Sequence, residues 1–225
     1  MVTSGVTHGS LADAVDGRSA RLRVLPAGDR ALLLEPDDPA TLPGLVDALR
    51  THAPEGVRDI LPAARTVLVT VAPGALARVA DRLRSLTPAA DSAGARSGEL
   101  VVPVRYDGAD LAEVAALLRI SPAEVIERHT GAQWRCAFVG FAPGFGYLEA
   151  PDAGLAVPRR SQARTRVPAG AVALAAGYSA VYPRSSPGGW QVIGSTDLVF
   201  WDVDRPQPAL VRPGTRVRFV EESAR

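Results

Sequence analysis

The fold is decided by the stretch that begins at Trp134, which reads WRCAFVGFAPGFGYL through Leu148. A run of residues that favour strands is followed by Pro143-Gly144, a pair that favours a type II turn, and aromatic side chains recur on both sides of it. Such a turn can expose backbone N–H groups beside an aromatic wall, or it can simply close a β core. The residues alone leave both interpretations open.

Downstream of this stretch, short strand-like runs alternate with proline and glycine. The runs cover residues 136–141, 171–176, 180–182, 190–193, 198–203 and 215–220. In the last run Val217 and Phe219 alternate with Arg216 and Arg218, which is typical of a strand with one face in water. Many short strands at this spacing predict a β-barrel or a sandwich.

Upstream, two helices precede the barrel sequence. Asp110 is an expected N-cap, and Ser121 with Pro122 and Glu124 forms an even stronger helix start. Gly131 is the expected C-terminal glycine, which places His129 in the last turn of the second helix. These signals make the second domain a mixture of helices and strands.

A boundary precedes this domain. Residues 88–98 contain no large apolar side chain and predict a linker between an N-terminal α+β domain, residues 21–87, and the barrel domain, residues 99–225. Within residues 21–87 the apolar pattern predicts strands and helices in the rough order β-α-β-β-α. Residues 1–20 are expected to form a disordered tail.

Composition excludes several classes of protein. The 225 residues carry a net charge of +1 and no lysine, which argues against a nucleic-acid binder, a Schiff-base enzyme and a P-loop. A single cysteine, the lack of a signal peptide and the lack of a long apolar run predict a cytoplasmic protein that does not enter a membrane. The cysteine and three scattered histidines give no metal-ligand set.

Two clusters could bind a small ligand. Arg164 and Arg166 share one face of an extended segment and could clamp a carboxylate or phosphate, although a solvated basic strand edge would look the same. The loop around Trp190 is rich in glycine and suits a small polar ligand, yet a tight loop with a packed tryptophan fits equally well. Of the histidines, His129 is the candidate for proton transfer, and a last-turn position favoured by the helix dipole is the alternative.

Together these segments resemble the family that contains the B subunit of 5-oxoprolinase. The same family includes the KipI kinase inhibitor and subunit 1 of allophanate hydrolase, and it is a carboxyltransferase-domain family. The similarity extends from about residue 22 to the C-terminus. The segments that carry it are His129-Thr130-Gly131, residues 140–148, residues 164–170, Gly177-Tyr178-Ser179, Tyr182-Pro183 and residues 187–196.

The resemblance implies a small ferredoxin-like α/β sandwich followed by a cyclophilin-like β-barrel. It implies a non-autonomous subunit that works with a carboxyltransferase-type C subunit and a lactam-opening A subunit, in a complex that uses ATP to convert 5-oxoproline to glutamate. ATP is expected to bind together with the partner subunits. The alternative is a KipI-like inhibitor of a sensor histidine kinase that has no turnover of its own.

Site residues follow from the same motifs. His129 is the expected catalytic residue, and backbone groups of two turns are expected to orient the lactam. The side chains expected to bind substrate are Tyr147, Arg164, Arg166, Tyr182, Trp190 and Gln191, and the two turns are Pro143-Gly144 and Gly188-Gly189.

Overall fold

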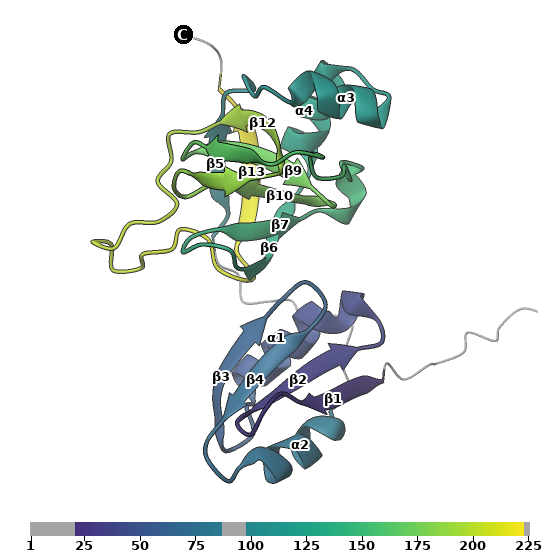
Figure 1. Cartoon of the computed structure of the whole chain (residues 1–225), viewed down its shortest axis with the longest axis vertical. Coiled ribbons are helices and arrows are strands. Elements are labelled where there is room, and N and C mark those ends of the chain that lie inside the picture. Colours follow the sequence, from purple (N-terminus) through teal and green to yellow (C-terminus); the bar gives the residue numbers. More distant parts are fainter. Residues whose placement is uncertain (1–20, 87–97, 223–225) are drawn as a thin grey trace, which may run out of the picture.

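The computed structural model describes residues 21–86 and 98–222, which form two bodies of mixed helix and strand (Figure 1). The predicted tail, residues 1–20, and residues 88–97 of the predicted linker lie outside the described residues. The lower body in Figure 1 contains a four-stranded sheet, and the upper body contains a seven-stranded one. At the contact between them, Arg135 approaches Asp47 at 3.7 Å.

The N-terminal sheet is antiparallel throughout, with the order β1-β2-β4-β3. Its strands are β1 (Leu22–Pro26), β2 (Ala31–Pro36), β3 (Val57–Pro62) and β4 (Val67–Val71), and its helices are α1 (Leu42–Thr51) and α2 (Leu76–Arg84). A ferredoxin-like fold runs β-α-β-β-α-β, whereas this body begins with two strands and ends with a helix. The ferredoxin-like detail therefore stays a prediction.

Both helices of this body pack on one face of the sheet. Alternate residues of β2 and β4 are buried, and they form one cluster with apolar residues of α1 and α2. Leu34, Leu49 and Leu83 are fully buried in it. The buried face of the strands, formed by every second residue, thus packs against the apolar stripes of the two helices.

The second body is a nearly closed barrel, so the barrel prediction is confirmed. Its sheet has the order β12-β9-β10-β7-β6-β13-β5. The strands are β5 (Leu100–Val104), β6 (Trp134–Val139), β7 (Gly146–Glu149), β9 (Ala171–Ala175), β10 (Tyr178–Val181), β12 (Gln191–Ser195) and β13 (Arg216–Glu221). A separate pair joins β8 (Arg164–Val167) to β11 (Ser186–Gly188).

The barrel closes where its two edge strands meet. Arg105, just after β5, exchanges two backbone hydrogen bonds of 2.8 Å with Ser195 of β12. The chain then continues beside β12, because the N–H groups of Gly108 and Asp110 donate to the carbonyls of Ile193 and Val192. We call residues 105–110 together with β12 the seam.

The seam needs glycine on both sides. A Cβ on Gly108 would lie 2.2 Å from the carbonyl carbon of Ile193, and one on Gly194 would lie 2.4 Å from the carbonyl oxygen of Arg105. These neighbours are backbone atoms, so they cannot move aside as a side chain would. Only residues without a Cβ permit this approach.

Two helices follow residues 105–110 in the chain, α3 (Leu111–Leu118) and α4 (Pro122–Gly131). Ser121 caps α4 as predicted, since its Oγ accepts a hydrogen bond from the N–H of Glu124 at 3.1 Å. Asp110 occupies the predicted N-cap position of α3, but its side chain makes no cap hydrogen bond. Its carboxylate points to arginines instead.

One predicted strand is absent from the described residues. Residues 198–203 form no strand and make a single bridge, between Trp201 and Ala209, in a loop that protrudes from the barrel (Figure 1). In the part of the chain that the structure describes, no helix has the length and apolar character required to cross a membrane.

Candidate functional site

A pocket of about 310 Å³ lies at the seam of the barrel. It is formed by the start of the α3 region, by β8 with the turn after it, and by β12. Its lining residues are Asp107, Gly108, Ala109, Arg164, Arg166, Val167, Pro168, Ala171, Val192, Gly194 and Ser195. The two arginines of the predicted anion clamp are thus both present at this pocket.

Asp110 occupies the centre of the ion pairs beside the pocket. Its carboxylate, 2% exposed, accepts two hydrogen bonds of 2.7 Å from the guanidinium of Arg164. Arg160 donates to the same carboxylate at 2.5 Å, and the N–H of Val192 donates at 2.7 Å. The group therefore ties β8 and β12 to the start of α3.

These contacts determine the charge of the group. Burial by itself would raise the pKa of Asp110, but the hydrogen bonds and positive charges of Arg164 and Arg160 outweigh it and hold the pKa below its ordinary value. The hydrogen bond to Asp110 also raises the pKa of Arg164. Both terminal nitrogens of Arg164 therefore already donate to an internal carboxylate.

Arg166 differs from Arg164 in its partners. It is exposed, its Nε donates to Ser185 Oγ at 3.1 Å, and the described residues offer it no ion pair. On the opposite side of the pocket, Ser195 Oγ donates to the carboxylate of Asp107 at 2.9 Å. The pocket thus presents one guanidinium and one carboxylate–hydroxyl pair to a ligand.

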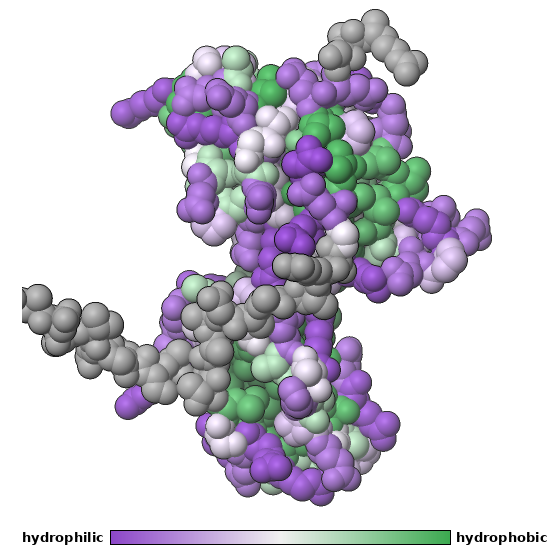
Figure 2. Space-filling view, turned by 180° about the vertical axis from the view of Figure 1, so that it is seen from behind, coloured by the Kyte–Doolittle hydropathy of each residue, from purple (hydrophilic) through white to green (hydrophobic). Residues whose placement is uncertain are grey.

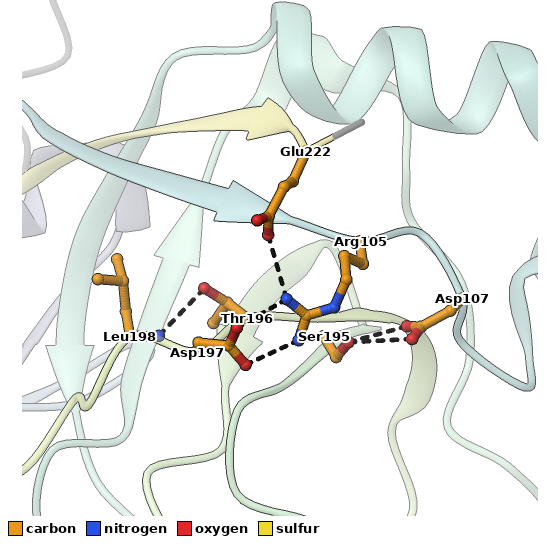
Figure 3. Close-up of polar contacts among 7 residues, drawn as sticks. All are labelled: Arg105, Asp107, Ser195, Thr196, Asp197, Leu198 and Glu222. Atoms are coloured by element: carbon orange, nitrogen blue, oxygen red, sulfur yellow. Dashed lines mark hydrogen bonds and ion pairs between the residues drawn. The ribbon is translucent and has the colours of Figure 1, made fainter. Parts of the chain in front are cut away.

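A second ionic group stabilises the seam next to the pocket (Figure 3). Arg105 makes a bidentate pair with Asp197, with two distances of 2.8 Å, and reaches Glu222 at 3.1 Å. The hydrogen bond from Arg105 lowers the pKa of Asp197. Figure 3 shows the Asp107–Ser195 pair next to this group. Their side chains come from segments about ninety residues apart.

The predicted aromatic residues gather around Phe145. The ring centroids of Tyr147, Tyr182 and Trp190 lie 5.2 to 5.5 Å from that of Phe145. Tyr182 and Trp190 are only 2% and 5% exposed, and neither lines the seam pocket. These rings back the pocket through Val167 and Ala171, which belong to the same apolar cluster, rather than forming its surface.

Gln191 and His129 lie in the barrel interior. Gln191 of β12 lies opposite Leu174 of β9, a residue of the barrel core, so it faces the core. The next residue, Val192, lines the pocket. The side chain of Gln191 is 1% exposed, and its Oε1 has no hydrogen-bond partner among the described residues. The prediction that its side chain binds substrate finds no support in this geometry.

His129 is fully buried. Its Nδ1 lies 2.7 Å from the Tyr106 hydroxyl, its Nε2 lies 2.9 Å from Ser179 Oγ, and its ring stacks on Phe219. Burial lowers the pKa of His129 to about 3, so the ring is neutral. A neutral imidazole donates through one nitrogen and accepts through the other, which satisfies both contacts. The predicted proton-transfer role has no geometric support at the seam pocket.

Neither of the two predicted turns lines the seam pocket. Pro143 and Gly144 line a different pocket, of about 410 Å³, and Gly144 has the φ of +79° that a type II turn requires. Gly188 packs against the hydroxyl of Tyr182, and the Gly189 carbonyl accepts from the N–H of Arg160 at 2.8 Å. The structure therefore separates the Pro143-Gly144 turn from the arginines, whereas Gly188 of the other turn pairs with Arg164 between β11 and β8.

No sequence pattern identified Asp107 and Ser195 as site residues, or Asp110 as the group that organises them. Asp107 and Asp110 stand between a strand and a helix, a place where polar side chains often serve a site. Ser195 belongs to a quoted motif but carried no separate signal. Its pairing with Asp107 depends on closure of the barrel, which no local pattern reveals.

Comparison with known proteins agrees with this architecture. Residues 22–211 match the family described as carboxyltransferase domain, subdomain C and D. The chain belongs to this family. It is 36% identical over 211 residues to the B subunit of 5-oxoprolinase from Escherichia coli O157:H7, an alignment that covers 90% of this chain and 97% of that protein.

Solved structures of other proteins share this fold. The crystal structure of TTHA0988 has 34% identity and a TM-score of 0.72, and the match covers 87% of this chain but 41% of that one. The K. lactis urea amidolyase has 17% identity and a TM-score of 0.66, with 91% of this chain and 15% of that chain covered. The latter similarity shows the fold alone. Both solved chains extend far beyond the region they share with this one.

Proposed function

We propose that this chain is the B-type subunit of an ATP-dependent 5-oxoprolinase, and that the seam pocket holds the 5-oxoproline. The observation that carries the proposal is the position of Arg166, which faces a small pocket and lacks an acidic partner among the described residues. A pocket of about 310 Å³ is at the small end of ligand sites and suits a compact molecule. The name of the E. coli relative supports the same substrate.

In this proposal each polar residue of the pocket has its own role. Arg166 binds the carboxylate of 5-oxoproline through its planar fork. Asp107 accepts the lactam N–H, and the hydroxyl of Ser195 holds the Asp107 carboxylate in place. Asp110 acts indirectly, because it fixes Arg164 and β12 and so positions the pocket wall.

Lactam hydrolysis is slow because amide resonance stabilises the ring, so activation of the carbonyl would help. In the proposed step, the lactam oxygen attacks the γ-phosphorus of ATP while Asp107 takes the lactam proton. A bond forms between that oxygen and phosphorus, the bond to the β,γ-bridging oxygen breaks, and ADP leaves. The chain has no lysine and no P-loop, so we propose that the partner subunits complete the nucleotide site and open the ring.

The test is ATP hydrolysis with and without 5-oxoproline in the complex assembled with the A and C subunits. Arg166→Ala should lower kcat/KM for 5-oxoproline about 100-fold, mostly through KM, because a charge-assisted bidentate contact is lost. Arg216→Ala is the control, since Arg216 is an exposed arginine on β13 outside the pocket. Unchanged kinetics in Arg166→Ala would refute the assignment of the pocket.

Asp107→Asn tests the second role in the same assay. We expect kcat to fall about 100-fold with a small change in KM, because the amide cannot accept the lactam proton. A rise in KM with kcat unchanged would make Asp107 a binding residue. Binding to a sensor kinase, combined with no 5-oxoproline-dependent turnover in the assembled complex, would favour the kinase-inhibitor alternative instead.

A further inference from the structure

The barrel carries a continuous apolar surface away from the seam pocket. Four of the large hydrophobic residues that are exposed lie on two segments that touch each other, the turn 140–144 and the loop segment 199–203. They are Phe141, Val199, Trp201 and Val203, with exposures of 61%, 58%, 36% and 70%. We call these four residues the apolar patch.

The two segments are in direct contact. A Cβ on Gly144 would lie 2.8 Å from Cβ of Trp201 and 3.0 Å from the carbonyl oxygen of Phe200. Between them lies the second pocket, of about 410 Å³, which Phe141 and Trp201 both line. Figure 2, seen from behind, shows hydrophobic residues gathered on the upper body beside the protruding loop. Phe141 and Trp201 therefore border one hollow, and Val199 and Val203 lie on the same loop segment as Trp201.

Phe141 is held exposed by a strained backbone. Its φ is +64°, and the N–H of Ala142 donates to the carbonyl of Gly140 at 2.7 Å, which makes Phe141 the centre of a γ-turn. A bulky residue at positive φ is an outlier, and such strain persists only where the surrounding structure enforces it. Here hydrogen bonds from Gly140 to Phe145 and from Phe145 to Ala142 fix the turn. The strain holds an aromatic ring in water, where burial by a partner would be favourable.

The rim of the hollow carries a positive charge. Arg212 lines the pocket, and its guanidinium donates to Gln207 at 2.8 Å without an ion pair within the described residues. An aromatic and aliphatic centre with an arginine at the edge is the usual composition of a protein interface. A matching surface would supply apolar side chains and a carboxylate.

The family comparison identifies the occupant. The chain matches subdomains C and D of a carboxyltransferase domain, so the domain has further subdomains that this match does not include. In TTHA0988 the part that matches this chain is 41% of one longer polypeptide, so there the same fold is covalently joined to more protein. We propose that the apolar patch docks the subunit that carries the remaining subdomains, which is the carboxyltransferase-type C subunit. This inference rests on the proposed function, because it assumes that the chain works in a complex.

The test uses isothermal titration calorimetry to measure how tightly the full-length chain binds the purified C subunit. Val203→Asp should weaken binding about 100-fold, and Phe141→Asn about tenfold, since hot-spot residues at an interface have effects of this size. Asparagine tolerates positive φ, so the second variant keeps the turn. Leu117→Asp on α3 is the matched control, because Leu117 is 47% exposed and lies outside the patch. Thermal melting of each variant verifies that it is folded.

Weaker binding by both variants with normal binding by Leu117→Asp would establish the docking surface. Equal affinity of all these proteins for the C subunit would overturn the inference and leave the proposed function standing. No binding by the wild type would overturn both. A wild-type dimer in sedimentation that Val203→Asp dissociates would also overturn the inference, since a second copy would then cover the patch.

Discussion

The barrel holds two polar groups of residues that differ in their access to water. Tyr106, His129 and Ser179 lie inside it, and every ring nitrogen of His129 is matched by a hydroxyl. Arg166 and Asp107 lie at the seam pocket, and neither forms a salt bridge among the described residues. The histidine predicted to be catalytic thus has both ring nitrogens engaged inside the barrel, whereas the guanidinium of Arg166 lies at a pocket without an acidic partner within the described residues.

The difference arises from the position of each group in the sheet. The interior group joins Tyr106 after β5, His129 of α4 and Ser179 of β10, and because it is largely buried its polar atoms must satisfy one another. The seam has one bridge between the edge strands and two further backbone hydrogen bonds, from Gly108 and Asp110 to β12, and the pocket lies beside them. The candidate site therefore lies where the barrel is closed by a few backbone hydrogen bonds and side-chain contacts instead of a full ladder.

The largest expected effect comes from removing the carboxylate that organises the seam. Asp110→Ala should lower the free energy of unfolding by about 4 kcal/mol, because Arg160 and Arg164 would keep partly buried charges without a partner. Urea denaturation monitored by tryptophan fluorescence measures this change. Asp197→Ala, at a carboxylate that is 83% exposed, should cost much less, because solvent screens an exposed pair. Similar losses in both variants would contradict the central role of Asp110.

The next effect concerns the backbone contact across the seam. Gly108→Ala should destabilise the barrel by about 3 kcal/mol, since the new methyl group would meet backbone atoms of residues 193 and 194. Gly131→Ala at the end of α4 is the control, because nothing lies within 4 Å of the place that its new methyl group would take. The melting temperatures of the two variants report the difference. A Gly108→Ala protein as stable as the wild type would mean that the seam can open without loss.

The interior group predicts a smaller effect that depends on pH. The pKa of His129 is about 3 in the folded protein and about 6.5 in the unfolded chain, so the unfolded chain binds more protons between these values. Stability contributed by the neutral ring is complete above pH 6.5 and falls as the pH drops, by about 2 kcal/mol at pH 5.

Urea denaturation at pH 7 and pH 5 checks this expectation. In His129→Gln the decrease between the two pH values should shrink by about 2 kcal/mol, because glutamine does not titrate there. His52→Gln, which removes an exposed histidine, is the matched control. An unchanged pH dependence in His129→Gln would show that this ring is not the titrating group.

Local patterns were enough to predict most elements of the fold. The cap at Ser121 and the alternation in β13 both appear in the structure where the sequence placed them, and residues 21–86 form the predicted mixture of strands and helices. These features depend on side chains within a few residues of one another. Residues 198–203 were predicted wrongly because Val199, Trp201 and Val203 alternate as in a strand, yet their apolar side chains are exposed in a loop.

The candidate site was predictable only in part. Arg164 and Arg166 were found because they share a face of one short strand, and both line the pocket. Their different partners were not predictable, since Asp110 lies 54 residues before Arg164 in the chain. The same holds for Ser195 and Asp107, which meet only when the edge strands of the barrel come together. Long-range pairing of this kind leaves no periodic signal in the sequence.

The arrangement of β13 has a consequence for synthesis of the protein. This strand lies between β6 and β5, so β5, the first strand of the barrel to be made, pairs in parallel with the last. While the ribosome is still translating residues 105–215, β5 has no neighbour on that side. The N-terminal sheet is complete once β4 has emerged, and the barrel must wait for its final strand. We therefore expect the nascent chain to fold in two separate stages.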